Sequence, residues 1–331
     1  MPLTGKVGRH LPRIDSAANT ILDEMRRLIV DWLKAGEDDA KLDMRMDLRT
    51  NLDLQQVGTC TWLYDNPTFK AWHNATSNAA VWYHAGPGAG KTILSSVLTK
   101  YLQDQGLKTA YFFYSFNDPS RRKAITAIRS LALQLLTQSD TIPDSVLRLY
   151  ETEVANRTFT LRDHHTIALV LQALLKQSSR IHVILDGLDE CYDRSLMRDI
   201  FVQLMSAETY GLVKWFFTSR NEPDLRSMTR QVGASEIVPS PKVIMGDIKK
   251  YLQDHMAGDH SIVCIDQWTT ASEGNFLWIH LMLRILTGMD LTCDEDIEEE
   301  LEKFPKGLTG CYLRSLQQLS LRSKQHQELA R

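Results

Sequence analysis

The sequence predicts an α/β fold: a parallel five-stranded sheet flanked by helices, with a smaller C-terminal helical domain and an N-terminal helix. Three observations predict this fold. Short, nearly all-apolar runs alternate with helical stretches between residues 81 and 239, as is typical of parallel strands that are buried on both faces. A glycine-rich segment directly follows the first run. After residue 241 only helical patterns remain.

The N-terminal region is predicted to form one amphipathic helix followed by a polar connector. From Ile14 to Leu33, apolar residues recur at steps of four and three, at Ile14, Ala18, Ile21, Met25, Leu28 and Trp32. This is the spacing of a helical seam. The charged stretch "AGEDDAKLDMRMDLRTN" that follows is typical of a connector. We expect the helix to pack on its own domain. The alternative is that it binds a protein partner or a second copy of the chain.

The remaining elements follow in order. The aromatic-rich stretch "GTCTWLYDNPTFKAWHN" is expected to pack against the sheet. The strands are expected at residues 81–84, 109–116, 181–186, 213–219 and 235–239. Helices are expected in "VIMGDIKKYLQDHM", "NFLWIHLMLRIL" and "DEDIEEELEKF". The chain is therefore expected to divide into an N-terminal helix and connector (1–57), a nucleotide-binding sheet domain (58–240) and a helical domain (241–331).

Composition argues against several classes of function. The net charge of −3 gives no overall basic balance, so we expect no nucleic-acid partner. The five cysteines (Cys60, Cys191, Cys264, Cys293 and Cys311) are scattered and indicate neither a disulfide framework nor a zinc site. The most apolar run, "FLWIHLMLRIL", is too short to span a bilayer, and the N-terminus lacks an apolar signal core. We expect a cytoplasmic protein that does not bind membranes.

The stretch "AGPGAGKT", from Ala85 to Thr92, lies between a predicted strand and a predicted helix, the context that a phosphate-binding loop requires. It follows the Walker A pattern G-x-x-x-x-G-K-[ST], except that its first residue is alanine. Gly86, Gly88, Ala89 and Gly90 would direct backbone amides at phosphate oxygens. Lys91 would reach the β- and γ-phosphates, and the Thr92 hydroxyl would bind Mg²⁺.

Two further strand ends carry polar groups that complete this site. In "VILDGLDE", Asp186 ends a buried strand and is the expected Mg²⁺ ligand, while Asp189 and Glu190 are candidates to orient and deprotonate an attacking water. In "KWFFTSR", Arg220 follows another strand and could contact the γ-phosphate. No N-K-x-D stretch, which reads guanine in Ras-like GTPases, is present. We therefore expect ATP, with GTP as the alternative.

Together, "WHNATSNAAVWYHAGPGAGKT", "YFFYSFND", "IRSLALQLL", "VILDGLDEC" and "WFFTSRNEPDL" resemble the NACHT NTPases of the STAND class, a branch of the P-loop NTPases. The likeness extends over about residues 50–315. It is greatest to the nephrocystin-3-like N-terminal domain that is common in fungal proteins with ankyrin or WD repeats. Its most specific mark is "DGLDE". In this stretch the small Gly187 follows Asp186, the expected Mg²⁺ ligand, and the acidic pair lies further along the chain, at Asp189 and Glu190.

The resemblance implies a signalling switch, in which ATP binding and slow hydrolysis convert a closed monomer into an open oligomer. In fungi such proteins are associated with responses similar to innate immunity. It also implies that Gly86 to Thr92 hold the phosphates, Asp186 holds Mg²⁺, Asp189 or Glu190 serves hydrolysis and Arg220 is the sensor arginine.

The sequence departs from the family pattern at three places. It ends at Arg331, close to the expected start of a winged-helix domain, so we expect a fragment, a truncated product or a stand-alone module. The N-terminal region is short for an effector domain. Phe276 occupies a place near the base where related switches have proline. A degenerate adaptor that binds nucleotide or partners without turnover is the alternative to a switch. A metabolic kinase is disfavoured because no acceptor-binding or lid segment is recognisable.

Overall fold

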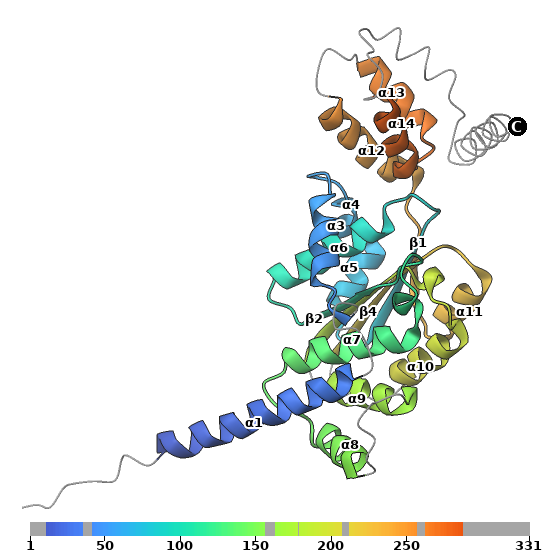
Figure 1. Ribbon diagram of the computed structural model, residues 1–331. Helices are drawn as coiled ribbons and strands as arrows, with labels where there is room; N and C mark the ends of the chain where they lie inside the picture. The colour runs from blue at the N-terminus through green and yellow to red at the C-terminus, as the bar shows by residue number, and fades with distance from the viewer. Residues whose placement is uncertain are drawn as a thin grey trace, which may run out of the picture.

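The structure, a computed structural model, describes residues 11–35, 42–155, 163–177, 179–206, 212–256 and 262–286 (Figure 1). Side chains are described from residue 20 onward, except in 262–264 and 284–286. The expected helix in "DEDIEEELEKF", together with Cys293 and Cys311, lies outside these residues, as does the side chain of Cys264.

The sheet has five parallel strands: β1 (Ala79–His84), β2 (Thr109–Phe113), β3 (Arg180–Asp186), β4 (Leu212–Ser219) and β5 (Ser235–Ile237). Their order is β2-β3-β4-β1-β5, and every neighbouring pair is parallel. All five expected strands are present, so the predicted fold class is confirmed. The second strand is shorter than the expected 109–116 because the chain leaves the sheet after Tyr114, whose amide N–H still donates to the carbonyl of Asp186.

Helices cover both faces of the sheet (Figure 1). The connection from β1 to β2 runs in the opposite direction along the sheet to the later ones, so a right-handed crossover places its helix on the opposite face. That helix, α6 (Lys91–Asp104), packs with α3 (Arg45–Asp53), and α5 (Pro67–Asn74) packs on β1 and β5. The other helices of the sheet unit are α4 (Trp62–Asp65), α7 (Ala124–Thr137), α8 (Asp144–Ala155), α9 (His164–Gln177), α10 (Arg194–Ser206) and α11 (Pro223–Gln231).

The N-terminal helix α1 (Leu11–Lys34) leaves the body of the molecule at one end and packs against α7 at the other (Figure 1). Ile29, Trp32 and Leu33 are buried in the main core, and the Arg26 guanidinium donates to backbone carbonyls at the end of α7. The C-terminal part of the helix thus packs on its own domain. The predicted seam is wrong in part, because Ile21 and Leu28 are exposed, at 64% and 42%, and the buried face runs through Ile29 and Leu33 instead. The seam residues Ile14 and Ala18 lie outside the described side chains.

A second hydrophobic core forms beyond the sheet. It is built by α12 (Pro241–His255), α13 (Ile262–Ala271) and α14 (Phe276–Leu286), which bury Trp268 and Trp278. Trp62 packs against both this core and that of the sheet unit. The Asp247 carboxylate strengthens the junction, because it accepts hydrogen bonds from the Cys60 amide at 2.8 Å and from the Trp62 indole at 3.1 Å.

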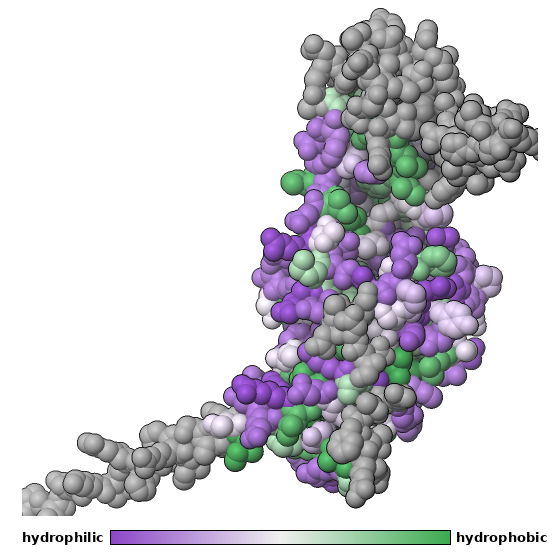
Figure 2. Space-filling view, in the orientation of Figure 1, coloured by the Kyte–Doolittle hydropathy of each residue, from purple (hydrophilic) through white to green (hydrophobic). Residues whose placement is uncertain are grey.

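On the face seen in Figure 2, hydrophilic residues predominate, with small hydrophobic patches between them. Among the described residues, no helix is both long and apolar enough to cross a membrane.

Candidate nucleotide-binding site

The glycine-rich loop, residues 85–90, joins the end of β1 to the start of α6. Gly88 and Gly90 have φ angles of +73° and +77°, which favour glycine because a side chain would strain the backbone there. Gly86 has neither a positive φ nor any atom within 4 Å of the position of a Cβ. The backbone conformation of the turn therefore requires glycine at 88 and 90. The first amides of α6 have no intrahelical partners, and no side chain of the N-cap residue, Gly90, caps them.

Helix α6 begins at Lys91, whose side chain folds back over the loop. Its ammonium group donates to the carbonyl oxygens of Ala85 at 3.1 Å and Gly86 at 2.9 Å. Burial lowers the pKa of Lys91, and the nearby charge of Arg220 acts in the same direction, while Asp189, Asp186 and Glu190 oppose the shift. The lysine is thus held at the loop by weak carbonyl acceptors that a more strongly charged oxygen could replace.

Asp186, at the end of β3, is the polar centre of the site. Its Oδ2 accepts from the Thr92 hydroxyl at 2.7 Å, and its Oδ1 accepts from Ser95 at 2.8 Å and Thr218 at 2.6 Å. The residue is 2% exposed. Burial raises the pKa of this carboxyl group, and the three hydroxyl donors and Lys91 act against the rise. Elements far apart in sequence therefore converge on one carboxylate.

Asp189 and Glu190, the acidic pair after β3, lie in different environments. The Asp189 carboxylate accepts from the Arg220 backbone amide at 2.9 Å and forms an ion pair with the Arg220 Nε at 3.1 Å. Its side chain is only 5% exposed. Glu190 is half-buried, and its Oε2 accepts from the Phe116 amide at 2.6 Å. Burial raises the pKa of Glu190, and the hydrogen bond from Phe116 opposes the rise.

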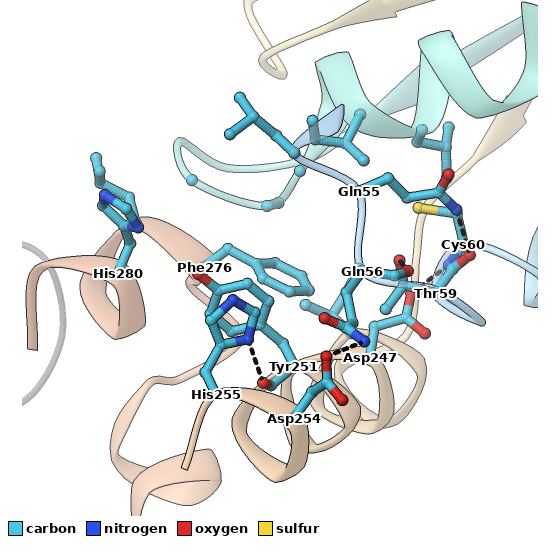
Figure 3. Close-up of a pocket in the computed structure, with 18 of the residues that line it drawn as sticks. Gln55, Gln56, Thr59, Cys60, Asp247, Tyr251, Asp254, His255, Phe276 and His280 are labelled. Carbon is cyan, nitrogen blue, oxygen red and sulfur yellow. Dashed lines mark hydrogen bonds between the residues drawn. The ribbon is translucent and has the colours of Figure 1, made fainter. Parts of the chain in front are cut away.

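A cavity of about 930 Å³ adjoins the glycine-rich loop on the side of the helical unit. Residues 53–62 and the loop form one wall, while α12 and the start of α14 form the other (Figure 3). The Tyr251 ring stacks on His255 at 4.0 Å between centroids and meets Phe276 edge-on at 6.1 Å. Gln56 and Asp254 are hydrogen-bonded across the cavity at 3.1 Å. The cavity thus combines aromatic faces with a few polar groups, as small-molecule sites commonly do.

The structure brings the expected residues Lys91, Thr92, Asp186, Asp189, Glu190 and Arg220 to one edge of the sheet. It also adds residues that sequence reasoning did not select. Ser95 lies one helical turn after Thr92 and so shares its face of α6, a spacing that the sequence could have revealed. Asp247 and Asn275 contact the site region from distant parts of the chain, and nothing in the local pattern identifies them.

A family model described as "Nephrocystin 3, N-terminal" matches residues 58–220. No curated protein matches the chain. Among solved structures, AMPPCP-bound DnaA from Aquifex aeolicus is 15% identical, with a TM-score of 0.44, and the match covers 76% of this chain and 68% of that chain. DnaA bound to AMPPCP and single-stranded DNA is 14% identical, with a TM-score of 0.43 and the same coverage. ORC1 from Aeropyrum pernix in complex with DNA is 12% identical, with a TM-score of 0.39, covering 68% of this chain and 53% of that chain.

Two of these structures correct one expectation. From the charge balance we expected no nucleic-acid partner, whereas two of these proteins are bound to DNA. The expectation of no nucleic-acid partner is therefore wrong, because the net charge of a whole chain does not describe where its charges lie.

Proposed function

We propose that the chain is a P-loop NTPase that binds ATP with Mg²⁺, hydrolyses it slowly and uses the nucleotide as a conformational and oligomerisation switch, as the NACHT-type STAND NTPases do. One observation carries the proposal: Lys91, Thr92 and Asp186 converge on a helix N-terminus that follows a glycine-rich loop. We place the protein in the cytoplasm, among switches of the kind associated with innate immunity in fungi.

The oxygen donors at the end of β3 fit Mg²⁺. Thr92 and Asp186 offer a hydroxyl and a carboxylate 2.7 Å apart, and hard oxygen ligands are those that Mg²⁺ prefers. The buried Asp186 carboxylate also gains from a neighbouring positive charge. Bound Mg²⁺ would neutralise charge on the phosphates. Lys91 would exchange its two carbonyl acceptors for phosphate oxygens, and the loop amides would hold the phosphate chain.

The environments of the two acids favour different roles. We assign the water-activating role to Glu190, because its half-buried carboxylate has a raised pKa and is held by a single backbone donor. Asp189 is instead committed to Arg220 through two contacts. We assign Asp189 to positioning the guanidinium of Arg220, which would contact the γ-phosphate.

We place the nucleoside in the cavity beside the glycine-rich loop. Gly88, Ala89 and Gly90 line the cavity, so it is continuous with the proposed phosphate site. The aromatic faces of Tyr251 and Phe276 suit a planar base. ATP remains our choice over GTP because no guanine-reading motif is present. The cavity is lined by residues from the end of the proposed region 1–57 and from the proposed domains 58–240 and 241–331, so a ligand in it would contact all three.

The test is binding and turnover of ATP in the presence of Mg²⁺. We expect Lys91→Ala to abolish ATP binding, because the charge that faces the phosphates is lost. Lys100→Ala, on the same helix but in an exposed ion pair with Asp104, is the matched control and should bind as wild type does. Glu190→Gln should keep binding and lose turnover.

Two results would refute these assignments. Equal ATP binding by wild type and Lys91→Ala would exclude the phosphate site, and full turnover by Glu190→Gln would exclude its role as the base. Size measurement with and without ATP then tests the switch. An assembly state that never responds to nucleotide argues for the adaptor alternative.

A further inference from the structure

The turn between α13 and α14 is bonded directly to the glycine-rich loop. The Asn275 side-chain amide donates to the Pro87 carbonyl at 3.0 Å, and the Phe276 backbone N–H donates to the Gly88 carbonyl at 2.8 Å. The Phe276 ring also lies 3.7 Å from the place that a Cβ would take on Gly90. Two successive loop carbonyls are thus fixed by a segment almost 190 residues away in sequence.

Both polar atoms of the Asn275 side chain form hydrogen bonds. Its Oδ1 accepts from the Trp278 amide at 3.0 Å and so caps the N-terminus of α14, while its Nδ2 holds the loop. The approach is close: a Cβ on Gly88 would lie 2.2 Å from the Asn275 Oδ1. The glycine at 88 is therefore required by this contact as well as by its φ angle.

The direction of these bonds matters for phosphate binding. In a loop whose backbone amides converge on an anion, the carbonyls point away from it. Holding the Pro87 and Gly88 carbonyls on the side of the helical unit therefore leaves the neighbouring amides directed toward the phosphate side. We propose that Asn275 is a positioning residue that holds the glycine-rich loop in its phosphate-binding conformation and thereby couples nucleotide occupancy to the placement of the α13–α14 turn. This inference rests on the proposed function, and it specifies how the site is regulated.

Coupling of this kind is reciprocal. If the contact between Asn275 and the loop favours ATP binding, ATP must favour that contact to the same degree. ATP should therefore slow amide hydrogen exchange in the α13–α14 turn, including the Phe276 N–H that bonds to the loop. Without the Asn275 donor, the turn should respond less.

The experiment compares wild type with Asn275→Ser and Asn275→Asp. Serine and aspartate are both good helix caps, but neither donates to the Pro87 carbonyl as the asparagine amide does. Serine adds no charge, so it separates loss of the donor from repulsion of phosphate. We expect Asn275→Ser to weaken ATP binding, measured by calorimetry with Mg²⁺, by roughly three- to tenfold, as loss of one hydrogen bond predicts. Asn275→Asp should weaken it at least as much.

Asn66→Ser is the matched control, because Asn66 caps α5 away from the loop. It should leave ATP affinity unchanged. ATP should slow exchange in residues 272–279 of wild type, and Asn275→Ser should reduce that effect. Wild-type ATP affinity in both Asn275 variants, with unchanged protection of the turn, would overturn the coupling. Failure of the proposed function is distinct, since Lys91→Ala would then bind ATP as wild type does.

Discussion

His182 lies in the middle of β3, fully buried, and neither of its ring nitrogens has a hydrogen-bond partner among the described residues. The Trp72 ring meets it edge-on at 5.6 Å, and the His73 ring lies 6.0 Å away. Burial lowers its pKa from 6.5 to about 3, and the positive charges of Arg180 and Lys214 act in the same direction. The folded protein therefore keeps this imidazole neutral.

The shift predicts a loss of stability in acid. Below pH 6.5 the unfolded chain binds a proton at His182, whereas the folded protein does not until the pH approaches 3. Stability must then fall as pH falls through this window. Each pH unit below 6.5 costs about 1.4 kcal/mol, so between pH 7 and pH 4.5 the contribution of His182 is a loss of about 2.5 kcal/mol.

Urea unfolding at pH 7, 6, 5 and 4.5, followed by tryptophan fluorescence, measures this loss. His182→Leu removes the titrating group and should reduce the acid-induced loss by about 2.5 kcal/mol at pH 4.5. His165→Leu, at an exposed position on α9, is the matched control and should follow the wild-type profile. If the free energies of unfolding of His182→Leu and wild type fall in parallel from pH 7 to pH 4.5, the pKa of His182 is not lowered in the folded protein.

Two further predictions concern single hydrogen-bond groups. Thr218→Val keeps the shape of the side chain but leaves the Gly187 amide, 3.1 Å from the Thr218 hydroxyl, unpaired in the interior and also removes one of the hydroxyl donors to Asp186. We expect it to lower the free energy of unfolding by about 1–3 kcal/mol in urea titrations, and an unchanged midpoint would contradict this. Asn66→Ala removes the acceptor for the Thr68 and Phe69 amides at the start of α5. It should cost about 1 kcal/mol by thermal unfolding, and Asn66→Asp should restore most of that stability.

The sequence by itself determined the fold class and the segments of the candidate site. Strand runs and helix periods are local signals, and the carboxyl ends of parallel strands lie at one edge of a sheet. The positions of the glycine-rich loop, Asp186 and Arg220 at a common edge could therefore be predicted from order alone. Ser95 could have been predicted in the same way, because residues three apart share a helical face.

Tertiary structure decided how these groups are paired. Asp189 and Glu190 are neighbours in sequence, yet one bonds to Arg220 and the other to the amide of Phe116. Asn275 reaches Pro87 across 188 residues, and Asp247 reaches Cys60 across 187. Such contacts depend on how two separately formed cores pack, and no local pattern encodes that packing. Local patterns therefore indicated the candidate nucleotide site, whereas packing between the cores decided which distant residues contact the glycine-rich loop.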